Sequence, residues 1–336
     1  MSVELTFVWR GELIESIHRG DVVVVNSKGK ILAYAGDPFK VTYIRSSAKP
    51  IQAINVFLSG AYGKFNFSDD EISIMCASHF GEDFHIKTVK NILNKIGASE
   101  KDLLCGGGYS INREYALKQA RENITITPLH SDCSGKHAGI IASCIAKGYE
   151  IKDYNKPNHP VQRDILEIIS KMCEIDKDKI ILGIDGCTVP VFGMPIYNLA
   201  LAFAKLSNPK DLEDDIKFAS ENIFRAMNTF PEMVAGTGGF CTELMKNTKG
   251  KLIGKLGAEA VYAVGVKDLD IGIAVKIEDG NFSRALYPVV VEVLERLKVL
   301  DEDEKEKLKS FKIIDNKNSV GDIVGVIKPV FTLKYL

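Results

Sequence analysis

The alternation of apolar and polar positions predicts sheet at both ends of the chain and helices between them. Residues 21–26 form a β-branched run, residues 27–30 a polar turn and residues 31–34 a second apolar run, which together predict a hairpin. Sheet patterns return at residues 251–277, and shorter ones at residues 312–314 and 322–327. This order predicts an α+β or mixed α/β fold, a sheet flanked by helices, in which the terminal strands join one sheet.

Helical periodicity marks several segments of the middle of the chain. Residues 85–96 and 136–147 are each followed by a glycine suited to a left-handed cap, and residues 68–71 form a capping box. Further helices are predicted at residues 160–173, 212–227 and 286–300, and another begins near Ser46 with Pro50 in its first turn. Residues 180–184 are predicted to be a buried strand. We expect residues 1–336 to form a single catalytic unit, with its helical part at about residues 60–230.

Composition excludes several classes of protein. The chain carries 43 Lys and Arg against 44 Asp and Glu, so no global field favours nucleic acid or an acidic membrane. No apolar stretch approaches the ~18 residues of a membrane helix, and the start of the chain, with Glu4, is not a secretory signal. Seven cysteines are an odd number, which predicts free thiols in a reducing cytoplasm.

Ser46 and Lys49 are the first candidates for chemistry. A serine attacks a substrate only when a neighbouring base takes its proton, and positions three apart share one helix face. Lys49 becomes such a base if its pKa falls, which burial and the adjacent cation Arg45 both favour. The alternative is a capping serine with a surface lysine, because Ser-x-x-Lys also occurs at residues 27–30 and 207–210 in patterns typical of solvated turns.

Two further segments carry reactive side chains close together. Cys-Ala-Ser-His at residues 76–79 follows a helix, and its alternative interpretation is a polar helix-to-loop transition. Residues 130–137 place Cys133 and Lys136 three apart, without the spacing of a phosphate-binding loop, which excludes nucleotide binding there. Zinc is bound by Cys, His or carboxylate, and a lysine ligand must first lose a proton, so metal loading would rise with pH. His130 and His137 are alternative ligands.

Asp185 and Cys187 follow a strand pattern, a place where α/β proteins often carry active-site groups. Asp185 is suited to bind a substrate ammonium group, although a strand-ending turn explains the same residues. Thr-Gly-Gly at residues 237–239 allows close approach of a ligand to the backbone, and Lys255 is a second possible base.

The order of these motifs resembles a known family. Arg-Ser-Ser-Ala-Lys-Pro at residues 45–50, Cys-Ala-Ser-His at 76–79, Cys-Ser-Gly-Lys-His-Ala-Gly at 133–139, Asp-Gly-Cys at 185–187, Met-Val-Ala-Gly-Thr-Gly at 233–238 and Gly-Ala-Glu at 257–259 resemble the rhizobial-type (class 3) bacterial L-asparaginases. The resemblance spans residues 3–330. It implies a fold like that of serine β-lactamases, penicillin-binding proteins and glutaminases, and a homodimer that hydrolyses L-asparagine to L-aspartate and ammonia.

The resemblance also implies roles for individual residues. It implies two Ser–Lys tandems, Ser46 with Lys49 and Ser78 with Lys255. It implies a zinc position, not plainly essential to catalysis, at Cys133, Lys136 and Cys187. It also implies a substrate pocket lined by Arg45, His137 and Asp185. Ser46 is predicted as the nucleophile ahead of Ser78 because local geometry ties Lys49 to it.

The chain departs from the family pattern at two positions. Phe80 stands where a small polar residue is usual, and Asp132 where asparagine is usual. A glutaminase or another acyl-transfer enzyme on the same scaffold remains an alternative, since one methylene changes binding by only ~1–3 kcal/mol. A non-catalytic zinc or amino-acid sensor is the alternative outside enzymes.

Overall fold

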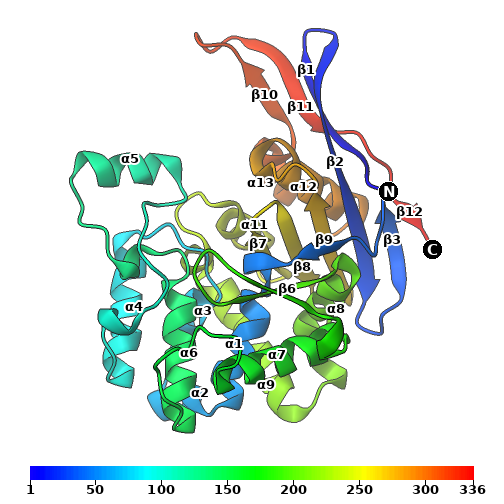
Figure 1. Cartoon of the computed structure of the whole chain (residues 1–336). Coiled ribbons are helices and arrows are strands. Elements are labelled where there is room, and N and C mark those ends of the chain that lie inside the picture. Colours follow the sequence, from blue (N-terminus) through cyan, green and yellow to red (C-terminus); the bar gives the residue numbers. More distant parts are fainter. The chain divides into compact units, whose positions relative to one another are not determined.

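The computed structural model describes all 336 residues, and the chain divides into two compact units. The sheet unit comprises residues Met1–Ser47, Met194–Asn208 and Asn247–Leu336, and the helical unit comprises Ala48–Gly193 and Pro209–Lys246 (Figure 1). The mixed α/β prediction is confirmed, because one unit is built on a sheet and the other mainly on helices. The prediction of a single catalytic unit stays a prediction.

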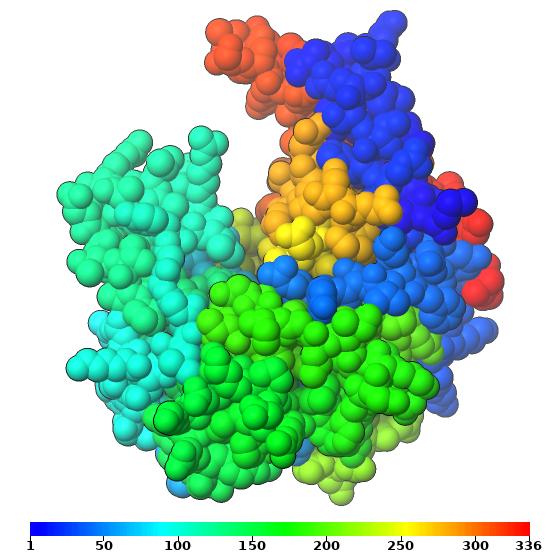
Figure 2. All heavy atoms as spheres, in the orientation of Figure 1, coloured from blue at the N-terminus to red at the C-terminus, as the bar shows by residue number.

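The sheet unit contains a nine-stranded sheet made from both ends of the chain. Its strand order is β10-β11-β1-β2-β9-β8-β7, with β3 paired to β2 and β12 paired to β3. In Figures 1 and 2 the blue N-terminal strands lie beside the red C-terminal ones, and the antiparallel register places Phe7 opposite Lys328. The strands are β1 (Val3–Arg10), β2 (Leu13–Asn26), β3 (Ile31–Ala35), β7 (Leu252–Gly257), β8 (Val261–Val266), β9 (Ile271–Ile277), β10 (Ile314–Lys317), β11 (Ile323–Pro329) and β12 (Lys334–Tyr335).

The predicted β-branched run lies at the centre of this sheet. The four consecutive valines that end at Val25 have no exposed surface, and β2 pairs with β1, β3 and β9. Helix α8 (Ile196–Ser207) packs directly on β9, since a Cβ at Gly272 would collide with the carbonyl oxygen of Ala200. The unit also contains β4 (Val41–Tyr43), α12 (Tyr287–Arg296) and α13 (Glu302–Lys312).

The helical unit is organised around α1 (Lys49–Leu58), which contacts α6, α7 and α9. The predicted capping box at Ser68 and Glu71 is present, and Gly97 and Gly148 end their helices with φ of 69° and 71°. The other elements are α2 (Ala61–Phe65), α3 (Asp69–Met75), α4 (Asp83–Ile96), α5 (Arg113–Arg121), α6 (Ser134–Lys147), α7 (Pro160–Cys173), β5 (Ile181–Ile184), α9 (Asp214–Thr229) and α10 (Pro231–Val234). The unit boundaries cross β6 (Pro190–Pro195) and α11 (Phe240–Thr248).

Two local predictions were wrong. The strand at residues 180–184 forms as β5 but is exposed rather than buried, with Ile181 54% and Ile184 61% exposed, because an apolar run does not by itself say what covers it. The helix predicted to begin near Ser46 begins at Lys49, after a 3-10 turn at Arg45–Ala48. Arg45 has a φ of 48°, a left-handed conformation that a right-handed helix does not accommodate.

All seven cysteines are buried free thiols, as predicted. None of the helices has the length and apolarity needed to span a bilayer.

Candidate active site

Lys49 is the first residue of α1 and is completely buried. Its Nζ donates hydrogen bonds to the carbonyl oxygen of Ala77 at 2.5 Å and to Oγ of Ser78 at 3.0 Å. The carboxylate of Asp132 lies 3.6 Å from the same nitrogen. The helical unit therefore pairs Lys49 with Ser78, whereas the sequence paired it with Ser46.

The pKa of Lys49 is raised, not lowered as the sequence-based prediction required. Burial lowers this pKa, but the electrostatic effects of Cys133 and Asp132 together outweigh burial. In the resting structure Lys49 is an ammonium group that donates to Ser78. It can take the serine proton only after its own proton has left.

Backbone hydrogen bonds hold the Ser78 segment on two sides. The N–H of Ser78 donates to the carbonyl oxygen of Val234 at 2.9 Å, and the N–H of Phe80 donates to that of Ala235 at 2.7 Å. Between them, the N–H of His79 donates to the carbonyl oxygen of Asp132 at 3.2 Å. These bonds place Ser78 between the loop after α10 and the segment that precedes α6.

His79 supports this segment and is not a base for Ser78. Its Nδ1 accepts the N–H of Gly81 at 3.1 Å, so its proton is on Nε2, which donates to Oγ of Ser134 at 2.8 Å. Burial is the main cause that lowers the pKa of His79 well below its usual value. The neutral ring, with both nitrogens paired, links the Ser78 segment to α6.

Phe80 packs against the glycine-rich loop that the sequence singled out. A Cβ at Gly236 would lie 2.5 Å from Cδ2 of Phe80, and one at Gly239 would lie 2.9 Å from its Cζ. The N–H of Thr237 donates to Oε2 of Glu82 at 2.9 Å. The glycines therefore make room for the Phe80 ring and hold the loop beneath Ser78. Packing against Phe80 therefore explains why glycine occupies positions 236 and 239.

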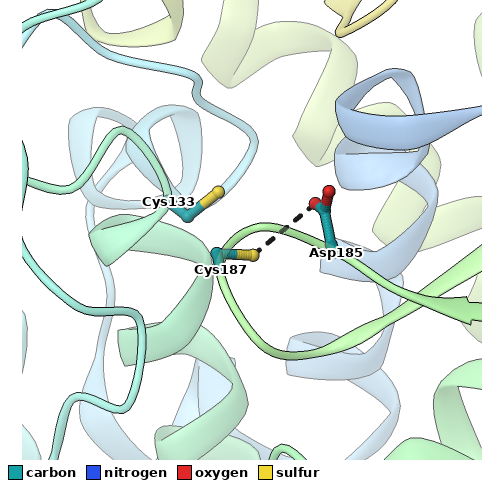
Figure 3. Close-up of side chains that lie close together, drawn as sticks. All are labelled: Cys133, Asp185 and Cys187. Atoms are coloured by element: carbon teal, nitrogen blue, oxygen red, sulfur yellow. Dashed lines mark hydrogen bonds between the residues drawn. The ribbon is translucent and has the colours of Figure 1, made fainter.

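A cluster of sulfur and carboxylate groups lies in the same unit. Sγ of Cys133, Sγ of Cys187 and a carboxylate oxygen of Asp185 lie within 4.8 Å of one another (Figure 3). Cys133 precedes α6, while Asp185 and Cys187 belong to the turn after β5, which the N–H of Thr188 closes onto the carbonyl oxygen of Asp185 at 2.9 Å. The fold thus joins two motifs that are far apart in sequence.

Lys136 supplies the positive charge of this cluster. Its Nζ donates to Sγ of Cys187 at 2.9 Å. Hydrogen bonding from Cys133 and the charge of Lys136 together lower the pKa of Cys187 despite its burial. The same hydrogen bond to Cys187, together with burial, raises the pKa of Cys133. Burial lowers the pKa of Lys136, but the effects of Cys133 and Cys187 together are larger than that of burial, so the pKa of Lys136 is raised. The arrangement is a thiolate at Cys187, a thiol at Cys133 and an ammonium at Lys136.

The donor set of this cluster fits zinc, for which two thiolates and a carboxylate are suitable ligands. The amine of Lys136 adjoins the cluster but has to lose its proton before it can bind a metal. The two histidines that the sequence left as alternative ligands make other contacts. His130 Nδ1 accepts the N–H of Thr127 at 3.1 Å, and His137 Nδ1 lies 2.6 Å from the hydroxyl of Tyr154.

A cavity of about 180 Å³ lies beside these groups in the helical unit. Asp132, the carboxylate beside Lys49, and Cys187, the partner of Lys136, both line it. The other lining residues are His79, Cys105, Gly107, Gly108, Tyr109, Ile111, His130, Ser131 and Gly186. The cavity, which is large enough for a small polar molecule, therefore adjoins the sulfur cluster through Cys187 and approaches the serine–lysine pair through Asp132 and His79.

The remaining candidates lie in the sheet unit. Arg45 and Ser46 are in the 3-10 turn, and Gly257 of β7 packs against this turn, since a Cβ there would lie 2.8 Å from the carbonyl oxygen of Ile44. Lys255, two residues earlier in β7, is completely buried and donates to the carbonyl oxygen of Leu256 at 2.8 Å. Each predicted Ser–Lys tandem combines residues of both units, so the two pairings stay predictions.

Comparison with known proteins gives one match to a family. The family model described as L-asparaginase II matches residues 6–329. No curated protein matches the chain.

Solved structures are similar only in part. A β-lactamase (Mb2281c) from Mycobacterium bovis has 15% identity and a TM-score of 0.44, over 84% of this chain and 95% of that one. A putative β-lactamase from Bacteroides dorei has 12% identity and a TM-score of 0.44, over 82% and 93%. Mglu in its native form has 10% identity and a TM-score of 0.39, over 85% and 63%.

Proposed function

Since the chain belongs to the L-asparaginase II family, we propose that it hydrolyses L-asparagine to L-aspartate and ammonia through a serine nucleophile and Lys49 as the base. Family membership makes the protein an asparaginase-type amidohydrolase. The observation that carries the proposed mechanism is the 3.0 Å hydrogen bond between Nζ of Lys49 and Oγ of Ser78. A buried lysine beside a hydroxyl is the arrangement that a serine needs to become nucleophilic.

In the proposed reaction, neutral Lys49 accepts the proton of Ser78 as the serine oxygen attacks the amide carbon of the substrate. The tetrahedral intermediate collapses, the C–N bond breaks, and the Lys49 ammonium returns the proton to the amide nitrogen, which departs as ammonia. Water then attacks the aspartyl ester with Lys49 again as the base, which releases aspartate and restores the serine. Each step exchanges one proton with Lys49, so the reaction balances without another co-reactant.

Ser46 stays the second candidate nucleophile, as the sequence predicts, with the same lysine as its base. In that case Ser78, which hydrogen-bonds with Lys49, would relay the proton, and Lys255 would assist Ser78. We assign the substrate α-ammonium to Asp185 and the α-carboxylate to Arg45, whose guanidinium suits bidentate binding of a carboxylate. His137 lines the pocket.

We also propose a zinc ion held by Cys133, Lys136 and Cys187, with Asp185 beside them. The three-group cluster of Cys133, Asp185 and Cys187 supports this assignment. When bound, the ion supplies positive charge that orients a carboxylate or polarises a carbonyl. Binding displaces protons from Cys133 and Lys136, so loading should increase with pH. Turnover through Ser78 and Lys49 does not require the ion.

The assembly and compartment follow the same family reasoning. We propose a homodimer, and the exposed apolar residues Ile181, Leu182 and Ile184 of β5 are available for such a contact. We propose the cytoplasm because the seven cysteines are free thiols, the state that a reducing compartment maintains.

The test is ammonia release from asparagine by Ser78→Ala and Ser46→Ala. Ser59→Ala is the matched control, because Ser59 lies at the end of α1 and its hydroxyl hydrogen-bonds with backbone atoms of Val56 and Ala61. Removal of the nucleophile should lower kcat by at least ~10³-fold. If only Ser46→Ala loses ammonia release, the nucleophile is Ser46 and the proposed asparaginase activity still holds. Wild-type protein that releases no ammonia from asparagine would contradict the proposed function, and release only from glutamine would favour the glutaminase alternative.

A further inference from the structure

Tyr154 is a buried tyrosine whose hydroxyl joins two segments of the helical unit. Its side chain has no exposed surface. The hydroxyl accepts the backbone N–H of Leu104 at 2.9 Å and lies 2.6 Å from Nδ1 of His137. The amide of Gln162 donates to the carbonyl oxygen of Tyr154 at 2.8 Å and anchors its backbone.

These contacts determine where the proton of His137 lies. A backbone N–H can only donate, so the Tyr154 oxygen is the acceptor toward Leu104. The single hydroxyl proton must then go to Nδ1 of His137, because a buried hydroxyl without an acceptor costs about 1–3 kcal/mol. Nδ1 is therefore unprotonated, and the neutral ring carries its proton on Nε2. An imidazolium would leave the phenol proton without a partner.

The other nitrogen of His137 faces the sulfur cluster. Nε2 is buried and makes no other hydrogen bond, and Cys187 acts on the ring through hydrogen bonding and charge, although burial is the larger cause and lowers the pKa of His137. The neighbouring residue Asn155 donates to Oγ1 of Thr188 at 3.1 Å, and Thr188 in turn donates to the carbonyl oxygen of Leu104 at 2.9 Å. The same short segment thus holds both His137 and the turn that carries Cys187.

We propose that Tyr154 is a positioning residue that holds His137 in the Nε2–H tautomer, so that His137 donates a hydrogen bond toward the sulfur of Cys187. In this tautomer His137 is neither a general base nor a metal ligand, because its unprotonated nitrogen, Nδ1, accepts the hydrogen bond of the Tyr154 hydroxyl. The effect on turnover rests on the proposed function, whereas the tautomer can be observed without activity. A hydrogen bond to a metal ligand from a neighbouring side chain orients that ligand and tunes the metal that it binds.

The decisive experiment is nitrogen NMR of metal-free protein labelled with ¹⁵N in the histidine rings. His137→Gln identifies the signals of His137. Wild type should show a neutral ring protonated at Nε2, and Tyr154→Phe should show a mixture of tautomers. Protonation at Nδ1 or an imidazolium in wild type would overturn the proposal, and this measurement stands even if Tyr154→Phe does not fold. An unchanged tautomer in folded Tyr154→Phe would also overturn it.

A second measurement separates positioning from general destabilisation. Tyr149→Phe is the matched control, because its hydroxyl hydrogen-bonds with the partly exposed Asp164 at 3.4 Å and not with the sulfur cluster. Zinc affinity, measured by competition with a chelator, should fall by about 10-fold in Tyr154→Phe and stay unchanged in the control. Equal affinities in both variants would contradict the proposed link to Cys187. Absence of ammonia release in wild type, with the Nε2–H tautomer present, would reject only the proposed function.

Discussion

Two buried lysines of the helical unit, Lys49 and Lys136, differ in the atoms that they face. Nζ of Lys49 pairs with oxygen atoms of Ala77, Ser78 and Asp132, whereas Nζ of Lys136 donates to the sulfur of Cys187. Burial favours the neutral amine at both sites, and nearby negative charge reverses that preference at both. The partner atom therefore distinguishes them more than burial does.

The difference in partner suggests a difference in role. A hydroxyl such as that of Ser78 can give its proton to a lysine during a reaction, and the lysine can return it. A thiolate such as Cys187 is stabilised by a lysine that keeps its proton. We interpret Lys49 as the group that moves protons and Lys136 as the group that holds charge in place. The following experiments test that contrast.

The largest effect is expected for Lys49→Met. Removal of a general base costs ~10²–10⁴-fold in rate, so kcat for asparagine should fall in that range. Lys147→Met is the matched control, because Lys147 pairs with Asp164 at the surface of the same unit. A Lys49→Met protein that is folded and has wild-type kcat would show that the base is another group, with Lys255 the next candidate.

Lys136→Met should have a smaller effect on turnover and a larger one on sulfur chemistry. Loss of the ammonium removes a charge that helps Cys133 lower the pKa of Cys187, so this pKa should rise and the thiolate signal at a given pH should decrease. Ultraviolet absorbance of the thiolate in metal-free protein measures this directly. We expect kcat to fall by no more than ~10-fold, since the general base is still present. An undiminished thiolate signal would assign its stabilisation to the hydrogen bonds from Cys133 and His137 and not to Lys136.

Asp132→Asn should shift the pH profile of kcat. Burial lowers the pKa of Lys49, while Cys133 and then Asp132 raise it, so removal of the carboxylate lowers the pKa. Activity that requires neutral Lys49 increases as pH rises through this pKa, so the rising limb should move to lower pH by about one unit. A rising limb that stays in place or moves to higher pH would contradict the assignment of Lys49 as the base.

The smallest effect concerns the loop that supports Ser78. Gly239→Ala places a methyl group 2.9 Å from the Phe80 ring and should lower the free energy of unfolding by ~1–3 kcal/mol. Gly63→Ala is the control, since no atom outside its own turn lies within 4 Å of a Cβ there. Denaturant unfolding compares the two. Equal stability of both variants would mean that the loop adapts and does not hold Ser78 in place.

The sequence alone determined the local elements and the list of chemical groups. The helix at residues 160–173 matches α7, and the capping box and the glycine caps of α4 and α6 occur where predicted. These features depend on neighbours within one or two turns, which a linear pattern records. The order of the motifs likewise identified the family that the comparison found.

Tertiary structure decided which of these groups meet. Lys49 hydrogen-bonds with Ser78, 29 positions away, and Lys136 with Cys187, 51 positions away, and neither separation has a local signature. The direction of the Lys49 pKa also depends on Cys133 and Asp132, which reach it only through the fold. Burial and electrostatics are sums over spatial neighbours, so the linear sequence predicts which chemical groups are present but not their protonation states.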